Sequence, residues 1–209
     1  MEVILASASP RRRKLLLQIG WTPVVVPPAF TEAKTLREAE EKAGALGVLR
    51  EGLASEADLL PLYNSVGKAK SVAGARPQEL VIAADTIVVI GGVILGKPRD
   101  EKEARAMLRA LSGKTHEVKT GVALCFEGQM KTAVVTTEVT FETMSDDDMD
   151  EYIASGEPMD KAGAYGIQGR GAAFISSIHG SYSNVVGLPL SVTRKFCEEF
   201  MRQGQPLRP

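Results

Sequence analysis

The feature that most constrains the fold is a long apolar strand followed by a short return. Residues Leu80 to Ile90 are almost wholly aliphatic and β-branched, and they are followed by Gly91-Gly92 and a second apolar run, Val93 to Leu95. Two glycines between two such runs indicate a β-hairpin. Because the first run is apolar on both faces, we expect it to be a central strand of a sheet flanked by helices.

The remaining segments alternate between helical and strand-like patterns. The sequence predicts strands at residues 3–6, 118–126, 133–141 and 173–178, and helices at 10–19, between 31 and 74 in two or three pieces with breaks near Gly52 and Pro61, at 100–111, 145–154 and 189–202. The strands at 118–126 and 133–141 are expected to pair antiparallel. The predicted fold class is therefore α/β, with a mixed, partly antiparallel sheet flanked by helices.

Charge and hydropathy exclude several classes of protein. The chain has 209 residues, with 25 Lys and Arg against 26 Asp and Glu, a net charge of −1 that provides no field for a nucleic-acid polymer or a membrane. No apolar run reaches the roughly 18 residues that a membrane span needs, and the N-terminus does not resemble a signal peptide, so we expect a cytoplasmic protein. Cys125 and Cys197 lie in apolar patterns and are read as buried hydrophobes.

A cluster of cations stands at a predicted helix start. Ser9 is a good N-cap and Pro10 a good first residue, so the run Arg11 to Lys14 falls in the first helical turn. The helix dipole disfavours each cation there by roughly 0.3–1 kcal/mol, which calls for a negative partner. Backbone N–H groups, the hydroxyls of Ser7 and Ser9 and the guanidinium groups suit a phosphate chain. The alternative is a surface helix whose arginines pair with carboxylates.

Asp85 and Thr86 are the only polar residues between Leu80 and Gly91. A buried carboxylate without a partner is costly, so Asp85 should lie near a cation, a metal or strong donors. Lys97 is the local candidate. A two-residue hairpin loop would place Thr86 opposite Lys97, whereas a three-residue loop with a glycine bulge would place Asp85 there, and the sequence permits both. A purely structural Asp–Lys pair is the alternative reading.

The chain is poor in ligands for soft metals. It has two histidines, His116 and His179, and both are read as structural. An oxygen-bound Mg²⁺ or Mn²⁺ held by Asp85 and Glu32 together with substrate phosphates fits the chemistry of these ions. Without a nucleophilic triad, a water molecule activated by a carboxylate or by a metal is the expected nucleophile.

A glycine-dense segment, Asp160 to Gly169, leaves backbone amides open to a ligand. Gln168 offers a donor and an acceptor on one amide, which matches the adjacent carbonyl and N–H of uracil or thymine. Lys161 could direct charge toward a phosphate. The alternative is an ordinary turn-rich connection.

Taken together, these stretches resemble the Maf family of nucleotide pyrophosphatases over nearly the whole chain. The matching motifs are Leu5-Ala6-Ser7-Ala8-Ser9-Pro10-Arg11-Arg12, Ala84-Asp85-Thr86-Ile87-Val88 with Gly96-Lys97-Pro98, Leu111-Ser112-Gly113 with His116, and Asp160 to Gly169. The last motif is similar to the branch that acts on dTTP and UTP. The resemblance implies hydrolysis of a nucleoside triphosphate to the monophosphate and pyrophosphate with a divalent metal, in a Maf/ITPase-like fold of two lobes around a central cleft.

The resemblance also implies roles for individual residues. Asp85 matches the family's proton acceptor, and Arg11, Thr86 and Gln168 match its specificity positions. Further polar positions are matched by Ser7, Arg12, Lys97 and Lys161, and more loosely by Glu32 and Lys68. We therefore expect Asp85 and Lys97 to be catalytic, Asp85 and Glu32 to bind the metal, and the other residues to bind substrate.

The implied architecture is one Maf-like domain over residues 1–209 with a helical insertion around 33–67, and a homodimer as in other family members. Two rival functions remain at this stage. One is a non-hydrolysing nucleotide-binding regulator linked to cell division, and the other is an interaction protein that recruits a partner through the insertion.

Overall fold

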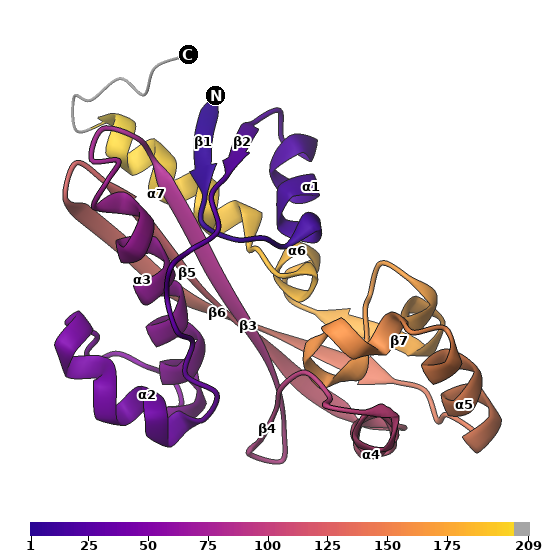
Figure 1. The fold of residues 1–209 in the computed structure, drawn as a ribbon. Coiled ribbons are helices and arrows are strands. Elements are labelled where there is room, and N and C mark those ends of the chain that lie inside the picture. Colours follow the sequence, from indigo (N-terminus) through magenta and orange to yellow (C-terminus); the bar gives the residue numbers. More distant parts are fainter. Residues whose placement is uncertain (203–209) are drawn as a thin grey trace. The chain divides into compact units, whose positions relative to one another are not determined.

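The computed structural model describes residues 1–202, which form a mixed α/β structure (Figure 1). The strands are β1 (Glu2–Leu5), β2 (Thr22–Val25), β3 (Val81–Ile90), β4 (Val93–Leu95), β5 (Thr115–Phe126), β6 (Gln129–Phe141) and β7 (Ile175–His179). The α-helices are α1 (Pro10–Gln18), α2 (Leu36–Ala43), α3 (Leu59–Ala73), α4 (Glu101–Leu111), α5 (Asp146–Ala154), α6 (Tyr182–Val186) and α7 (Leu190–Arg202).

One seven-stranded sheet has the order β2-β1-β3-β5-β6-β7, with β4 paired to β3 off this path. β1 pairs in parallel with β2 and β3, whereas β3–β4 and β6–β7 are antiparallel. The prediction of a mixed α/β sheet flanked by helices is confirmed. No helix within residues 1–202 has the length and apolar character that a bilayer crossing requires.

The chain divides into two compact units. Among the described residues, unit 1 contains Met1–Asp85, Thr120–Val135 and residues 187–202, and unit 2 contains Thr86–Lys119 and Thr136–Val186. The expectation of a single domain with an insertion around 33–67 stays a prediction.

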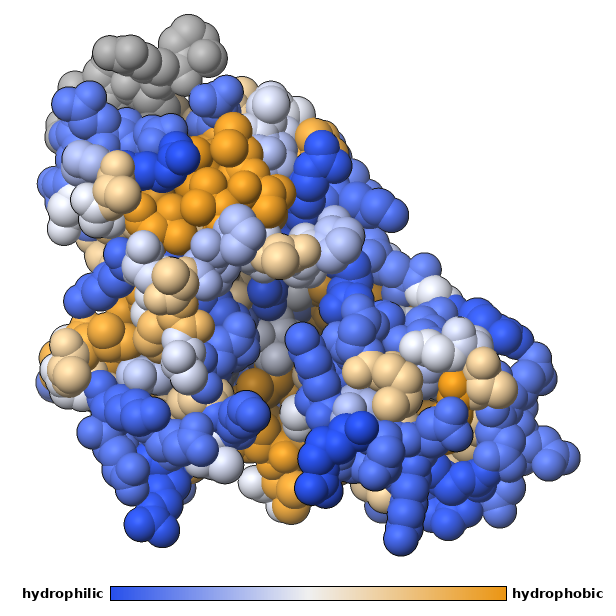
Figure 2. All heavy atoms as spheres, viewed as in Figure 1, coloured by the Kyte–Doolittle hydropathy of each residue, from blue (hydrophilic) through white to orange (hydrophobic). Residues whose placement is uncertain are grey.

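In unit 1 the first two strands are parallel, and α1 supplies the crossover that parallel neighbours need. Leu5 of β1 pairs with Val25 of β2 and with Ile82 of β3. The sequence did not predict β2, whose four residues include a proline, a residue that is tolerated in an edge strand such as this one. Val24 and Val25 stay 39% exposed, and Figure 2 shows hydrophobic surface where Figure 1 draws β1 and β2.

Helix α3 is the most deeply buried helix segment of unit 1, and its surroundings explain two special residues. Pro61 lies in the first turn, where a backbone N–H has no helical partner to lose, so the predicted break near Pro61 is wrong. Gly121 of β5 lets the helix approach the sheet, because a Cβ there would lie 2.2 Å from the Pro61 carbonyl oxygen. Close packing of α3 on β5 therefore requires glycine at this position.

The β3–β4 hairpin has a two-residue turn. Gly91 and Gly92 have φ angles of 55° and 79°, as a type I′ turn needs, and Ile90 pairs with Val93. The pairing runs back to Val88 and Leu95, so the two-residue alternative is confirmed and the glycine-bulge alternative is wrong. In this register Thr86, and not Asp85, is the position that corresponds to Lys97.

Unit 2 has its own core, in which α4 and α5 bury apolar residues against Phe141 and Tyr165. Helices α4 and α5 begin with side-chain caps: the Asp100 side chain accepts the Glu103 N–H at 2.7 Å, and Ser145 and Asp148 cap each other reciprocally. Helix α6 was not predicted, because five residues inside a glycine-dense segment give no periodic signal.

Candidate active site

The buried carboxylate of Asp85 has a partner on each oxygen. The Lys68 ammonium lies 2.7 Å from Oδ1, and the Asn64 side-chain amide donates to Oδ2 at 3.0 Å. The side chains of Lys68 and Asp85 are 5% and 13% exposed, so the charge is compensated inside the protein. The cation therefore comes from α3, and not from the local candidate Lys97.

Lys68 joins Asp85 to a second carboxylate. Its ammonium also lies 2.9 Å from Glu32 Oε1, on a side chain that is 54% exposed. One ammonium thus bridges a buried carboxylate and a solvent-facing one. The structure brings together Glu32, Lys68 and Asp85, of which the first two were matched only loosely from the sequence.

The start of α1 contributes the cation Arg12. Ser9 and Pro10 begin the helix as predicted, and no acidic residue stands in its first turn. The Arg12 guanidinium donates to Ser7 Oγ at 3.1 Å and to the Gly187 carbonyl at 2.7 Å. These contacts fix the guanidinium against the loop that follows β1.

The carboxylates act on Arg12 electrostatically. Burial lowers the pKa of Arg12, while the charges of Asp85 and Glu32 act in the opposite direction and raise it. The neighbouring Arg11 lowers the pKa further. Within unit 1, the cationic helix start and the two carboxylates therefore share one electrostatic environment.

Four of the predicted site residues belong to unit 2. Thr86 is half-buried on β3, Lys97 is exposed after β4, and Gln168 is exposed in the glycine-dense segment. The Lys161 ammonium is 2.6 Å from Asp160 Oδ1 and donates to the Glu157 carbonyl at 2.7 Å. Because the Gly163 N–H donates to the Gly96 carbonyl at 3.0 Å, the segments that carry Lys97 and Lys161 are neighbours.

Two residues that the sequence did not single out organise the segment around Gln168. The Glu157 carboxylate accepts the N–H of Arg170 at 2.9 Å and the hydroxyl of Tyr152 at 2.8 Å. The same hydroxyl accepts the Gly166 N–H at 3.1 Å. Burial would raise the pKa of Glu157, but these hydrogen bonds outweigh it and hold the pKa below its ordinary value.

His116 is buried in unit 2, as expected for a structural histidine. Its Nε2 lies 2.8 Å from the Tyr165 hydroxyl, and its ring packs edge-on against Phe141 and Tyr165. Burial lowers its pKa from 6.5 to about 4. The ring is therefore neutral near pH 7 and is not a cation for phosphate.

The residues that could hold a metal are few. Within residues 1–202 no group of three or more His, Cys, Asp or Glu side chains converges on one point. Glu32 and Asp85 are two carboxylates that lie next to one ammonium, that of Lys68. Mg²⁺ commonly takes one or two carboxylates and completes its shell with water and substrate phosphates, so this donor set fits such an ion.

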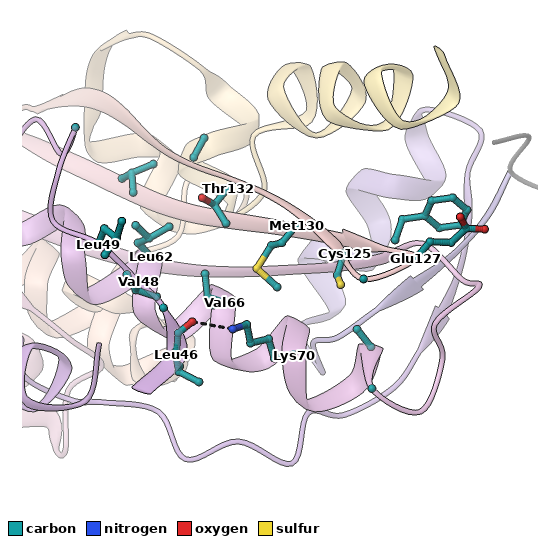
Figure 3. Close-up of a pocket in the computed structure, with 18 of the residues that line it drawn as sticks. Leu46, Val48, Leu49, Leu62, Val66, Lys70, Cys125, Glu127, Met130 and Thr132 are labelled. Carbon is teal, nitrogen blue, oxygen red and sulfur yellow. Dashed lines mark hydrogen bonds between the residues drawn. The ribbon is translucent and has the colours of Figure 1, made fainter. Parts of the chain in front are cut away.

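A separate apolar groove of about 840 Å³ lies in unit 1 (Figure 3). One wall is α3, through Leu62, Val66 and Lys70, and others include Cys125 and Met130. The Lys70 ammonium donates to the Leu46 carbonyl at 2.7 Å, and none of the predicted site residues lines the groove. Helix α3 thus borders the groove with one face and presents Asn64 and Lys68 to Asp85 with another.

Asn64 is the residue of this site that sequence reasoning missed. It lies on the largely buried helix α3 and is 2% exposed. The sequence did contain a signal for Asn64. It lies four residues before Lys68, and residues four apart lie on the same face of a helix.

Comparison with known proteins gives a consistent picture. The family model described as "Maf-like protein" matches residues 2–200. A protein of Anaeromyxobacter dehalogenans (strain 2CP-C) named "dTTP/UTP pyrophosphatase" is 46% identical over 209 residues, covering 98% of this chain and 95% of that protein. Proteins of the same name from Salmonella typhimurium and Bacillus pumilus are 47% and 43% identical, covering 94% and 95% of this chain and 91% and 96% of theirs.

Among solved structures, "The structure of the Staphylococcus aureus Ham1 protein" matches with a TM-score of 0.41 and 13% identity, covering 68% of this chain and 72% of that chain. A similarity of this size carries no inference about the site.

Proposed function

This chain belongs to the Maf family, and from that premise we propose that it hydrolyses dTTP and UTP to the monophosphate and pyrophosphate. The relatives named "dTTP/UTP pyrophosphatase" match it over nearly their full length. The observation that carries the proposal is a buried aspartate with each carboxylate oxygen engaged, next to a second carboxylate and a cationic helix start.

We propose that Asp85 is the proton acceptor. A carboxylate has about four lone-pair sites, so the bonds from Lys68 and Asn64 leave capacity for a water molecule. The water oxygen bonds to the α-phosphorus, its proton passes to Asp85, and the bond from the α-phosphorus to the bridging oxygen breaks. Pyrophosphate leaves with the electrons of that bond.

Phosphate binding is proposed for Ser7, Arg11 and Arg12 at the start of α1, with Lys68, Lys97 and Lys161 as further cations. The donors of Arg12 are partly engaged by Ser7 and Gly187, which preorganises the guanidinium before substrate arrives. Catalysis of phosphoryl chemistry rests mainly on such positioned charge, because the leaving group develops negative charge in the transition state. For Lys97 we propose stabilisation of that charge.

Base recognition is proposed for Gln168 and Thr86. The Gln168 amide can accept from the ring N–H and donate to the adjacent carbonyl that uracil and thymine share. Support comes from the exposure of Gln168 and from the Glu157–Tyr152 hydrogen bonds that hold the neighbouring backbone. Because both bases present this edge, one residue serves dTTP and UTP alike.

We propose a divalent metal, Mg²⁺ or Mn²⁺, on Glu32 and Asp85. When bound, such an ion neutralises phosphate charge in the transition state. Lys68 already compensates both carboxylates, and its flexible stem would allow the ammonium to turn toward a phosphate oxygen. We further propose that the chain is cytoplasmic and acts as a homodimer, with residues 33–67 as an inserted helical region of one domain.

The test is pyrophosphate release from a panel of purine and pyrimidine nucleoside triphosphates with Mg²⁺, with Mn²⁺ and with EDTA. We expect turnover of dTTP and UTP and loss of turnover in EDTA. Saturable nucleotide binding without any product would instead favour the non-hydrolysing regulator. Light scattering of the same sample reports whether the protein is a dimer.

A further inference from the structure

Helix α3 places two buried polar side chains, one helical turn apart, on the same carboxylate. Lys68 contacts Oδ1 of Asp85 and Asn64 donates to Oδ2. Asn64 also makes a two-way contact with the backbone of Ala33: its Nδ2 donates to the Ala33 carbonyl at 3.0 Å, and its Oδ1 accepts the Ala33 N–H at 2.9 Å. Both amide hydrogens of Asn64 and its oxygen are therefore used.

The segment next to Ala33 is held against the same helix by packing. The ring of Phe30 lies over Gly67, where a Cβ would come within 2.1 Å of Phe30 Cζ, and it contacts Tyr63 with ring centroids 5.6 Å apart. A glycine in the middle of α3 is unfavourable for the helix and is explained by this close approach. Glu32 then reaches Lys68, one turn from Asn64.

These contacts form one continuous connection between the two carboxylates. Asn64 binds the backbone immediately after Glu32 and also binds Asp85, so it links the two groups through a single rigid amide. Lys68 links them a second time through charge. An aliphatic residue at position 64 would fill the same space without holding either group.

We infer that Asn64 is a positioning residue that fixes Glu32 and Asp85 relative to each other for the reaction. The inference rests on the proposed function, in which the two carboxylates act together. In this role Asn64 does not contact the substrate. Its effect is expected in kcat, because it orients groups that act in the transition state, and not in nucleotide affinity.

The experiment compares Asn64→Leu with Ser65→Ala, a matched control at the next position of α3. Ser65 is fully buried, and within residues 1–202 its hydroxyl donates to one acceptor, the Leu62 carbonyl of its own helix. The full-length proteins are assayed for pyrophosphate release from dTTP and UTP. Hydrogen–deuterium exchange of a peptide covering residues 28–36 is measured without nucleotide.

For Asn64→Leu we expect kcat to fall by about 10- to 100-fold, as for loss of a hydrogen bond to a charged group, with KM within about threefold of wild type. Exchange over residues 28–36 should rise, because the Ala33 N–H loses its acceptor. Ser65→Ala should leave kcat and this exchange near wild type.

A second variant keeps the inference testable if Asn64→Leu does not fold. Asn64→Asp has the same shape and can still accept the Ala33 N–H, but it loses both donors and places a carboxylate beside Asp85. It should keep exchange over residues 28–36 closer to wild type than Asn64→Leu does and still lose kcat.

An active wild type together with an Asn64→Leu or Asn64→Asp variant of unchanged kcat would overturn the inference. A KM that rises in either variant in proportion to the loss of kcat would also overturn the inference. Unchanged exchange over residues 28–36 in Asn64→Leu would do the same. An inactive wild type is a different result, because it removes the proposed function itself.

Discussion

The ammonium of Lys68 lies 2.7 Å from Asp85 Oδ1, although the two residues come from α3 and β3 and are 17 positions apart in the chain. The same ammonium reaches Glu32 at 2.9 Å. One buried cation therefore balances two carboxylates, and the electrostatics of the site depend on how α3 packs against the sheet.

Replacing Asp85 by Asn should remove turnover while the protein stays folded, because the Lys68 ammonium keeps Glu32 as a partner. The amide has the same shape but cannot accept a proton from water, and general bases contribute roughly 10²- to 10⁴-fold. The measurements are kcat for dTTP and UTP and the circular dichroism spectrum. Asp147→Asn, an exposed position in the first turn of α5, is the control and should have wild-type activity. Wild-type rates in Asp85→Asn would refute its role as the proton acceptor.

Replacing Lys68 by Met should strongly destabilise the protein. The change leaves the buried Asp85 carboxylate without its cation, and breaking such a pair costs about 3–5 kcal/mol in the free energy of unfolding. Urea denaturation measures the loss.

The double variant Lys68→Met/Asp85→Asn should recover part of that stability, because no buried carboxylate is left without its cation and Glu32 is 54% exposed. A single variant that loses less than about 1 kcal/mol, as exposed ion pairs do, would contradict the buried pair.

Gly67 within α3 and Gly74 at its C-cap should respond in opposite ways to alanine. At Gly67 a methyl group would meet the ring of Phe30 at 2.1 Å, so Gly67→Ala should destabilise by about 1–3 kcal/mol. Gly74 has helical φ and ψ angles of −56° and −35°, and its Cβ would approach no atom closer than 3.8 Å. Gly74→Ala should therefore stabilise by about 0.4–1 kcal/mol through the unfolded state. Thermal or urea unfolding measures both changes in stability. Equal changes for Gly67→Ala and Gly74→Ala would show that Phe30 does not pack against Gly67 as described.

Stability should fall as the pH drops from 6.5 toward 4 because of His116. Its pKa is lowered to about 4 in the folded protein, so below 6.5 the unfolded chain binds a proton that the folded chain does not. The stabilisation is complete above pH 6.5, and a shift of this size corresponds to roughly 3 kcal/mol lost by pH 4.

Comparing the pH dependence of unfolding for wild type and His116→Gln isolates this contribution. The variant should lose less stability over the same pH range, because its residue 116 does not titrate. If stability falls with pH as steeply in His116→Gln as in the wild type, groups other than His116 cause the pH dependence.

The sequence identified Asp85 because a lone carboxylate in an aliphatic strand is conspicuous, but it could not identify the partner. Lys97 was the candidate because it follows the return of the β3–β4 hairpin, whereas Lys68 reaches Asp85 through the packing of α3, which no local pattern encodes. Asn64 was missed for the same reason, because its three hydrogen bonds join it to Ala33 and Asp85, which are distant in the sequence.

The sequence predicted those features whose interacting residues are close together in the chain. The caps at Asp100 and Ser145 and the glycine turn at 91–92 follow from residues that are neighbours in sequence. Pro61 misled because proline disrupts the interior of a helix but is tolerated in its first turn, and the start of α3 two residues earlier was not visible in the pattern. The strand β2 depends on pairing with β1 more than on its own composition.

The two-residue turn at Gly91 and Gly92 makes an exposed loop intolerant of most side chains, although no described atom lies within 4 Å of a Cβ at either position. Both φ angles are positive, a conformation that is strained for most residues other than glycine, asparagine and aspartate. The tolerated substitutions at this surface turn should therefore be few, and backbone conformation alone would select them.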